Sequence, residues 1–460
     1  MNDITDTICA LSTPPGHSGI AVVRVSGGRS LSILDKIFQA KSGLQQFGVR
    51  RAVLGKFINP VDGSEIDEGI ATCFCAPHSY TGEDMCELSI HGSPVLVSSV
   101  LDCLCEAGAR LAAPGEFTMR AFLNGKIDLA QAEAIRDIID SSTHYQAQVA
   151  AKQRSGMMGQ KLSPIKEQLV DVIVHLESTV EFADEDLALA SRDEIAGRLE
   201  GLRETLSEWV RSYRKGRVIR DGFSLAIVGG PNVGKSSLFN ALLEQHRSIV
   251  TDIPGTTRDL VSESMNIGGI PVRLQDTAGI HDAGDVVENL GMEQSRQAIA
   301  DSDAILLVGD GSRLFVSSDT EFTKQLAGMR CISVINKSDL ACLWSDYDKG
   351  SFAVNGEWIE VSARTKAGIE PLRAKILEEI IGPDSGTRDS VLITNLRHCR
   401  ALEAAAQEMG QGVNALKLGL SEEFALTNLL KALQLLGEIT GETRVEDLLD
   451  EIFARFCIGK

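Results

Sequence analysis

The sequence predicts a multidomain protein of the α/β plus α class, with a phosphate-binding α/β domain inserted into a helical domain and a mixed α/β domain ahead of both. Three observations predict this arrangement. A glycine-rich loop lies between a strand pattern and a helix pattern near the middle of the chain. Strand and helix patterns alternate after this loop, whereas helical spacing dominates the segments on both of its sides. A chain of 460 residues has room for roughly three domains.

We expect four segments along the chain. Residues 1–118 form the mixed α/β domain, residues 119–215 the first part of the helical domain, residues 216–383 the inserted domain and residues 384–460 the second helical part. The two helical parts are joined in this prediction because an isolated amphipathic helix must bury its apolar face somewhere. Two separate helical bundles are the alternative.

The composition limits the possible classes of protein. A formal net charge of −19 argues against a general nucleic-acid coat, although a local basic site remains possible in the cluster 211–220, for which a solvated linker is the favoured interpretation. No apolar run approaches the ~18 residues of a membrane span, and the N-terminus lacks a signal-peptide pattern. The 10 cysteines show no C-x-x-C spacing, which favours reduced thiols in a cytoplasmic protein over a metal cluster.

The segments around the central domain have clear local patterns. In the first 118 residues, strand patterns alternate with helical spacing, and the expected strands are 20–25, 53–58, 69–74 and 85–91, with helices at 30–39 and 94–107. Apolar residues then recur at helical spacing from Ile165 to Val180. Near the C-terminus, Thr443 and Glu446 form a capping box before a second amphipathic pattern that ends at Phe456.

The glycine-rich loop has the form G-x-x-x-x-G-K-[ST], between the apolar run 225–228 and the helical pattern 238–243. Backbone N–H groups at the start of the helix, together with its dipole, favour a bound phosphate. Lys235 supplies a cation to the β and γ phosphates, and the Ser236 hydroxyl ligates Mg²⁺. The nucleotide contacts predicted in this loop are Asn232, Val233, Gly234, Lys235, Ser236 and Ser237.

Four further stretches are expected to select guanine, contact Mg²⁺ and sense the γ-phosphate. Asp276 ends a strand, where it can reach Mg²⁺ through water, and Asp339 can accept two hydrogen bonds from guanine that adenine cannot donate. The loop 251–259 has threonines that can add a second Mg²⁺ hydroxyl, which we assign to Thr257, and it is expected to order on GTP. The further predicted GTP contacts are Thr251, Asp252, Ile253, Pro254, Gly255, Thr256, Thr257, Asp276, Thr277, Ala278, Gly279, Asn336, Lys337, Asp339, Ser362 and Ala363. Together these motifs predict a P-loop GTPase domain of the Ras-like type.

The group that orients water for hydrolysis is not evident from these motifs. Many small GTPases carry glutamine after the D-x-x-G stretch, but this chain has Ile280, which cannot polarise water. The downstream acids are candidates, and they are Asp282, Asp285, Glu288 and Glu293. A monovalent cation held by the Asn232 side-chain oxygen could supply positive charge near the β–γ bridge.

Six motifs, five of them outside the GTPase region, carry a resemblance to a family. They are Thr13-Pro14-Pro15-Gly16, Tyr80-Thr81-Gly82-Glu83-Asp84, Pro114-Gly115-Glu116-Phe117, Arg120-Ala121-Phe122-Leu123-Asn124-Gly125-Lys126, Gly255-Thr256-Thr257-Arg258-Asp259 and Phe456-Cys457-Ile458-Gly459-Lys460. With them the chain resembles, nearly end to end, the tRNA-modifying GTPases called MnmE or TrmE. The GTPase motifs alone are also found in ribosome-assembly GTPases.

The resemblance implies a folate-binding N-terminal domain, which also forms a homodimer, and a K⁺-stimulated GTPase inserted in a split helical domain. It further implies a flavin-dependent partner, MnmG (GidA). Together the two proteins would modify the wobble uridine of certain tRNAs at carbon 5, adding an aminomethyl or carboxymethylaminomethyl group. The one-carbon unit would come from a tetrahydrofolate in its 5-formyl or 5,10-methylene form.

The resemblance also implies roles for individual residues. Glu288 matches the water-orienting glutamate, and the positions that match the K⁺ site are Asn232, Thr251, Ile253 and Thr256. The positions that match folate contacts are Arg24, Glu87, Lys126 and Lys460. Cys457 is either a reactive thiol or a small apolar residue at a helix end, and Arg24 with Glu87 could instead be a surface ion pair. His281 departs from the arginine of many members, and a free histidine is mostly neutral at pH 7.

Two main functions remain open at this point, with a folate-dependent enzyme that acts on protein or small molecules as a third, less favoured one. The chain is either an enzyme of tRNA modification or an RNA- or ribosome-associated GTPase switch without chemistry of its own. The switch would have no need of Arg24, Glu87, Lys126 or Cys457, so folate binding separates the two.

Overall fold

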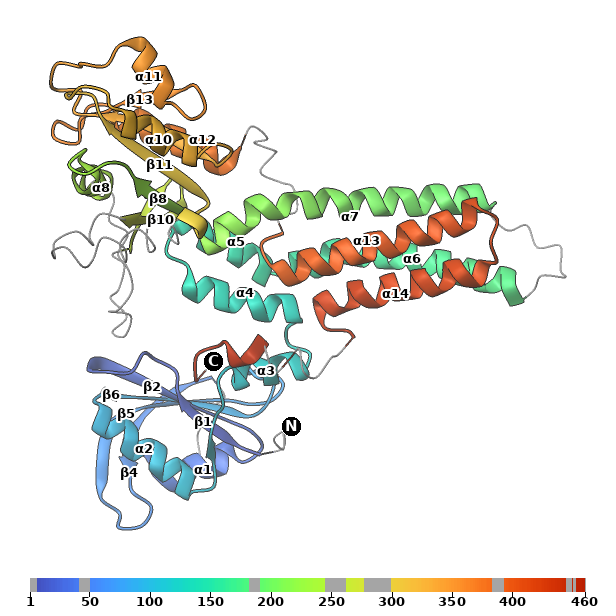
Figure 1. Cartoon of the computed structure of the whole chain (residues 1–460). Coiled ribbons are helices and arrows are strands. Elements are labelled where there is room, and N and C mark those ends of the chain that lie inside the picture. The colour runs from blue at the N-terminus through green and yellow to red at the C-terminus, as the bar shows by residue number, and fades with distance from the viewer. Residues whose placement is uncertain are drawn as a thin grey trace, which may run out of the picture. The chain divides into compact units, whose positions relative to one another are not determined.

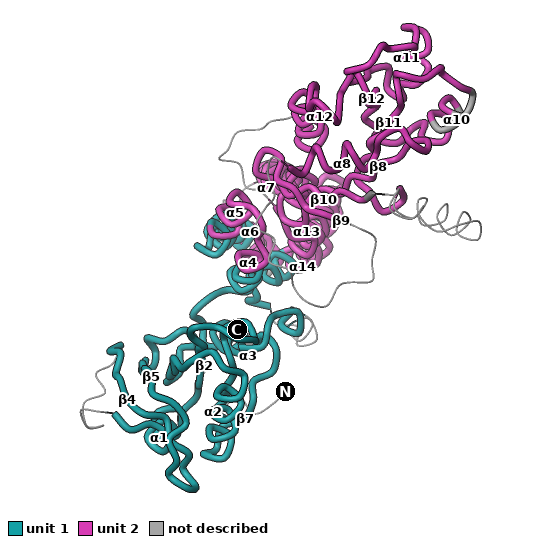
Figure 2. The backbone as a smooth tube through the Cα atoms, turned by 90° about the vertical axis from the view of Figure 1, so that its left-hand side faces the viewer, with its two compact units in different colours: residues 1–136, 152–171, 433–460 teal, residues 137–151, 172–432 magenta. Residues whose placement is uncertain are grey.

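The computed structural model describes residues 6–40, 50–181, 191–244, 262–276, 299–382, 393–443, 449 and 452–459. The chain divides into two compact units, each made of separate stretches of sequence (Figure 2). Unit 1 comprises residues 1–136, 152–171 and 433–460, and unit 2 comprises residues 137–151 and 172–432. The domain limits expected at residues 118, 215 and 383 remain predictions.

Unit 1 contains a seven-stranded sheet in the order β3-β4-β5-β6-β2-β1-β7. Neighbouring strands are antiparallel except for the parallel pair β1–β7. The strands are β1 (Ile8–Leu11), β2 (Ser18–Ser26), β3 (Phe38–Ala40), β4 (Ala52–Ile58), β5 (Glu65–Phe74), β6 (Met85–Gly92) and β7 (Arg110–Leu111). The four strands expected from the sequence are therefore confirmed, since β-branched and apolar residues alternate along them.

One face of this sheet is covered by α1 (Ser30–Ile37) and α2 (Pro94–Glu106) (Figure 1). Their apolar residues pack in one buried cluster with the inward residues of the strands, among them Val23 and Leu88. The residues that alternate with these, such as Arg24 and Glu87, are only half-buried, because successive side chains of a strand point to opposite faces.

Among the described residues, seven further helices lie in the segments on both sides of the second sheet. They are α3 (Glu116–Leu123), α4 (Leu129–Asp140), α5 (His144–Arg154), α6 (Met157–Glu181), α7 (Arg192–Asp221), α13 (Leu396–Lys417) and α14 (Glu422–Thr440). The apolar face expected from residue 165 onward is buried at Ile165, Leu169, Val172, Ile173 and Leu176, whereas Val180 is exposed. Of the C-terminal pattern, Leu449, Phe453 and Phe456 are buried in unit 1, while Glu446 of the expected capping box lies outside the described residues.

The sequence favours a solvated linker for the basic cluster 211–220, and this interpretation is wrong because the cluster is helical. It continues α7 up to Asp221, because arginine and lysine favour helix and because acids of the same helix and of other elements pair with them. Arg211 pairs with Glu204, Arg217 with Asp303 and Arg220 with Asp137.

In unit 2, α7 and α13 lie side by side (Figure 1). A Cβ at Gly216 of α7 would lie 2.0 Å from the Ile393 carbonyl oxygen, so glycine allows the chain that leads into α13 to approach closely. The C-terminal end of α7, where Gly216 also lies, is fixed to the sheet that follows it in the chain. Asp303 accepts hydrogen bonds from Arg217 and from the Ser224 N–H, and Gln146 Nε2 of α5 donates to the Arg220 carbonyl at 2.8 Å.

The sheet of unit 2 has six strands in the order β13-β12-β11-β8-β10-β9. They are parallel except for the edge hairpin β9–β10, which confirms the expected parallel sheet. Its strands are β8 (Phe223–Val228), β9 (Ser262–Ile267), β10 (Ile270–Asp276), β11 (Ala304–Asp310), β12 (Cys331–Asn336) and β13 (Trp358–Glu360). Its helices include α8 (Lys235–Leu243), α10 (Ser317–Gln325), α11 (Asp346–Phe352) and α12 (Ile369–Ile381).

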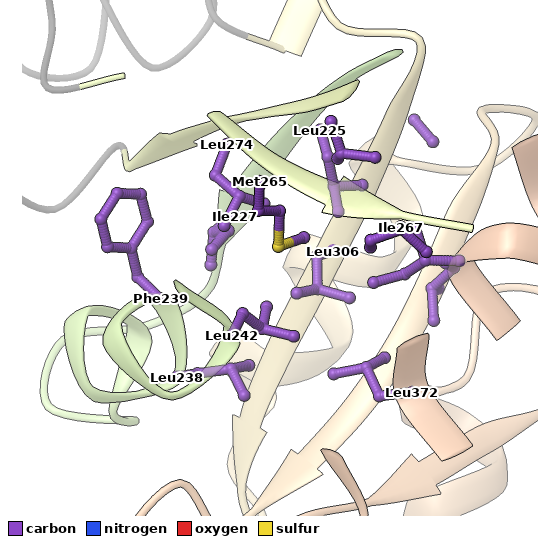
Figure 3. Packing of buried hydrophobic residues seen from close by; sticks show 14 of the residues in the cluster. Leu225, Ile227, Leu238, Phe239, Leu242, Met265, Ile267, Leu274, Leu306 and Leu372 are labelled. Carbon is purple, nitrogen blue, oxygen red and sulfur yellow. The ribbon is translucent and has the colours of Figure 1, made fainter. Parts of the chain in front are cut away.

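Apolar clusters cover both faces of this sheet. On one face, Leu225, Leu274 and Leu306 from three strands meet Leu242 of α8 and Leu372 of α12 (Figure 3). The second cluster includes Ile305, Trp344 and Phe352 on the opposite face. Alternate residues of β11 thus enter different clusters, which is why this strand is apolar throughout.

The part of the chain that the structure describes contains no helix long and apolar enough to cross a membrane. All 10 cysteines lie in that part, and each is a free thiol.

Candidate functional site

The glycine-rich loop joins β8 to α8, as the sequence predicts. Gly229 and Gly234 both have positive φ angles, of 154° and 93°. A Cβ at Gly229 would lie 2.2 Å from the Val308 carbonyl oxygen, and one at Gly234 would lie 2.4 Å from Asn336 Nδ2. Only glycine fits both positions, so these two residues fix the path of the loop around the start of α8.

Lys235 is the first residue of α8 and its side chain turns back into the loop. It is only 8% exposed, and its Nζ donates hydrogen bonds to the carbonyl oxygens of Gly229, at 3.0 Å, and Gly230, at 2.8 Å. The ammonium group is therefore held where the loop N–H groups and the α8 dipole favour an anion. Ser236 and Ser237 follow in the first turn of the same helix.

Asn336 connects this loop to the segment that follows β13. It ends β12 and is 2% exposed. Its Nδ2 donates to the Val233 carbonyl at 3.0 Å, and its Oδ1 accepts from the Ala363 N–H at 3.1 Å. One amide side chain thus joins the phosphate loop, 103 residues earlier in the sequence, to the segment at Ala363, 27 residues later.

Lys337 lies beside Asp310, a residue that the sequence reading missed. Lys337 Nζ is 2.6 Å from Asp310 Oδ2 and 3.1 Å from the Asn232 carbonyl oxygen. Burial raises the pKa of Asp310, but hydrogen bonds from Lys337 and Ser312 outweigh it, and the pKa falls below its usual value. Asp310 could have been found, since it ends an apolar strand in register with Asn336.

Asp339 is the residue expected to read the guanine base. Ser362 Oγ donates to its Oδ1 at 2.6 Å, and this hydrogen bond is the largest cause of a pKa below the usual value for aspartate. Ser362 is fully buried, and its hydroxyl oxygen also accepts from the Thr365 N–H at 3.1 Å. The carboxylate is therefore ionised at neutral pH and aligned as an acceptor, while its exposed surface remains available to a base.

Several predicted GTP contacts lie outside the described residues. They are Thr251, Asp252, Ile253, Pro254, Gly255, Thr256, Thr257, Thr277, Ala278 and Gly279, together with Ile280, His281 and Glu288. Asp276 is the last residue of β10, in register with Ile227 of β8. The carboxyl ends of β8, β10, β11 and β12 meet at one edge of the sheet, which is where parallel α/β sheets bind ligands.

A second group of predicted residues lies in unit 1. Arg24 of β2 and Glu87 of β6 are cross-strand neighbours, and Arg24 Nε donates to Glu87 Oε1 at 2.9 Å. Lys126 Nζ donates to the Pro77 carbonyl at 2.8 Å. The ion pair that the sequence left as an alternative therefore exists, and it presents a fixed Arg24 on the face of the sheet opposite to α1 and α2.

The guanidinium of Arg24 also lies over the ring of Tyr80, with its Cζ 5.3 Å from the ring centroid. In the sequence, Tyr80 stands out only as part of the motif 80–84, which assigns it no role of its own. Tyr80 lies in the loop between β5 and β6. Its position beside Arg24 depends on the conformation of this loop, which the spacing of residues in the sequence does not predict.

The C-terminal segment lies against the N-terminal strand of the same unit. Ser12 Oγ donates to the Gly459 carbonyl at 3.0 Å, and the Gly115 N–H donates to the Cys457 carbonyl at 3.4 Å. The Cys457 side chain is exposed. Lys460 lies outside the described residues.

Comparisons with known proteins agree with these features. A family model described as the MnmE helical domain matches residues 129–457, and one described as the GTP-binding protein TrmE N-terminus matches residues 7–126. The tRNA modification GTPase MnmE of Koribacter versatilis is 42% identical over 462 residues, covering 100% of both chains. Those of Thermoanaerobacter pseudethanolicus and Aquifex aeolicus are 42% and 41% identical, each covering 99% of this chain and 100% of the relative.

Proposed function

This chain belongs to the MnmE (TrmE) family of tRNA modification GTPases, and we propose that it hydrolyses GTP to drive modification of carbon 5 of the wobble uridine in certain tRNAs. With a flavin-dependent partner, MnmG, it would add an aminomethyl or carboxymethylaminomethyl group. The observation that carries the GTPase part is the constellation at one sheet edge, where Lys235 faces the phosphate loop and Asp339 is held by Ser362.

The residues at this edge have complementary tasks in the proposal. The loop N–H groups and Lys235 bind the phosphates, and the buried Asn336 keeps the loop in register with the base-reading segment. Asp339 accepts hydrogen bonds from the guanine N1–H and 2-amino group, and would be left unpaired by adenine. The Ser236 hydroxyl in the first turn of α8 fits a Mg²⁺ ligand, with Thr257 as the second hydroxyl and Asp276 acting through water; Mg²⁺ would neutralise phosphate charge.

Hydrolysis needs a group that orients water, and we assign it to Glu288, because Ile280 cannot polarise water. We assign K⁺ binding to Asn232, Thr251, Ile253 and Thr256. Asn232 has a φ of 59°, a conformation that asparagine adopts more readily than most residues, and its carbonyl is held by Lys337. Faster hydrolysis in K⁺ than in Na⁺ at equal ionic strength would support the cation site, and equal rates would count against it.

The N-terminal domain is proposed to bind a 5-formyl or 5,10-methylene tetrahydrofolate through Arg24, Glu87 and Lys126, with Lys460 as a further contact. The exposed Cys457 is proposed as a reactive thiol near this site, since its segment lies against the end of β1. We further propose a cytoplasmic homodimer joined through its N-terminal domains.

The test is mass spectrometry of wobble uridines in tRNA from a bacterial strain lacking its own MnmE, with and without this gene. Return of the carbon-5 modification is expected. Unmodified uridine would leave either an incompatible host partner or a GTPase switch without chemistry. Titration of the purified protein with 5-formyltetrahydrofolate then separates these two, since a switch has no reason to bind it.

A further inference from the structure

We propose that Tyr80 and Thr118 are positioning residues for Arg24, which fix its guanidinium in the orientation that receives a reduced pterin. This inference rests on the proposed folate binding and names the residues that make the site rigid. Neither side chain is expected to touch the ligand. They act through Arg24, on which the flat, acceptor-rich edge of a pterin would dock.

Arg24 is constrained on one edge and one face. Its Nε donates to Glu87 at 2.9 Å, and the Tyr80 ring covers one face of the guanidinium. In the part of the chain that is described, the side chain of Arg24 donates only through Nε, so Nη1 and Nη2 have no protein acceptor there. The side chain is 22% exposed. Because the guanidinium is planar, fixing an edge and a face fixes the direction of the remaining N–H fork, which suits a bidentate planar acceptor.

The Tyr80 side chain is held in turn by a contact with α3. Its hydroxyl lies 2.8 Å from the Thr118 Oγ1 on α3, and Thr118 is fully buried. The ring packs against a small apolar cluster that includes Ala10 and Phe117. Ala10 is also the cross-strand neighbour of Arg24, so the Tyr80 ring and the Arg24 side chain both lie beside this residue. Without the hydroxyl pair, the ring keeps its packing but loses the contact that selects its orientation.

The backbone on both sides of Tyr80 is tied to the same helical segment. Asn124 Nδ2 donates to the Thr81 carbonyl at 2.8 Å, and the buried Arg120 of α3 lies 3.3 Å from Glu83. Lys126, the other described folate candidate, donates to the Pro77 carbonyl in the same loop. One loop therefore supports Arg24 and accepts a hydrogen bond from Lys126, two residues that the sequence separates by about 100 positions.

The experiment is calorimetric titration of the full-length protein with 5-formyltetrahydrofolate. Tyr80→Phe and Thr118→Val remove the same hydrogen bond from its two ends, so each should weaken binding by roughly three- to tenfold. The double variant should be no weaker than the poorer single variant, because the bond can be lost only once. Thr118→Ser keeps the hydroxyl and should retain wild-type affinity. Tyr347→Phe, a change on the exposed surface of α11, is the matched control.

A second background separates positioning from general structural damage. In Arg24→Lys, which loses the Nε–H and the planar fork, adding Tyr80→Phe should weaken binding no further, with the titration extended to millimolar ligand. An equal additional loss in that background would overturn the positioning role, as would wild-type affinity of both Tyr80→Phe and Thr118→Val. If the wild-type protein itself binds no 5-formyltetrahydrofolate, the proposed folate function fails and this inference with it.

Discussion

The two sheets of this chain build their candidate sites in different places. In the six-stranded sheet, Lys235, Asp310 and Asn336 stand at the carboxyl ends of parallel strands. In the seven-stranded sheet, Arg24 and Glu87 lie within antiparallel strands and face away from the buried core. The first site is made of short loops that each contain a recognisable motif, and the second of single residues that strand pairing brings together.

This difference decides what each site depends on. A strand-end site depends on loop conformation, which Gly229 and Gly234 fix locally. A mid-strand site depends on register, since a slip of one residue would move Arg24 to the opposite face of the sheet. Substitutions should therefore act on the first site individually and strongly, and on the second through neighbours and more weakly.

The largest effect should come from Lys235→Ala. Loss of the Lys235 cation, which is proposed to bind the phosphates, should lower the rate of GTP hydrolysis by roughly 10²- to 10³-fold, as for other single charge-stabilising donors. Steady-state phosphate release measures it, with Lys324→Ala on the exposed side of α10 as the control. Hydrolysis within threefold of wild type would show that the loop does not hold the phosphates.

A smaller effect is expected for Asp339→Asn. A charge-assisted pair of hydrogen bonds is lost, so the preference for GTP over ATP should fall by roughly 10- to 100-fold. Binding of XTP should improve, because xanthine has a carbonyl where guanine has its amino group. Competition against a fluorescent GTP analogue measures all three nucleotides. Unchanged selectivity would contradict the base-reading role, and Asp346→Asn on α11 is the matched control.

Glu87→Gln tests the mid-strand site. It keeps a hydrogen-bond acceptor for Arg24 but removes the charge, and affinity for 5-formyltetrahydrofolate should fall by roughly three- to tenfold. The control is Glu65→Gln, which removes another ion pair from the same sheet, the exposed pair with Lys56. A similar loss in both variants would mean that surface charge in general, and not the Arg24 pair, sets the affinity.

The smallest effect concerns pH. The pKa of Asp310 is lower in the folded protein than its ordinary value, so its ionised form stabilises the fold at neutral pH. This contribution, about 1 kcal/mol, is complete above the ordinary aspartate value and is lost as pH falls through the lower folded value. The stability difference between wild type and Asp310→Asn should thus close below about pH 4. Urea unfolding followed by tryptophan fluorescence measures it, with Asp301→Asn, a change at an exposed aspartate of the same unit, as the control.

The same contrast explains which features the sequence could predict. The phosphate loop and the strands around it were predictable because their signals are contiguous, and Asn336 and Asp339 follow directly from a strand end. Asp310 ends an apolar strand, which the sequence shows, but its ion pair with Lys337 depends on the pairing of β11 with β12, which the sequence does not show. The contact of Tyr80 with Arg24 was beyond sequence reasoning, since it requires the register of β2 against β6. The basic cluster 211–220 was misread as a linker, because its acidic partners come from other elements.

α7 leads directly into β8, the strand before the phosphate loop, so a rotation of the sheet would also move the helix. Its 30 residues span roughly 45 Å, and Gly222 alone separates it from β8. Because Asp303 and Gln146 form hydrogen bonds at this junction, the orientation of α7 relative to β8 is fixed there. A tilt of about 5° in the nucleotide-binding sheet would sweep the distant end of α7 through roughly 4 Å. A tilt that hardly moves the phosphate loop would therefore displace the distant end of α7 by about the size of a side chain.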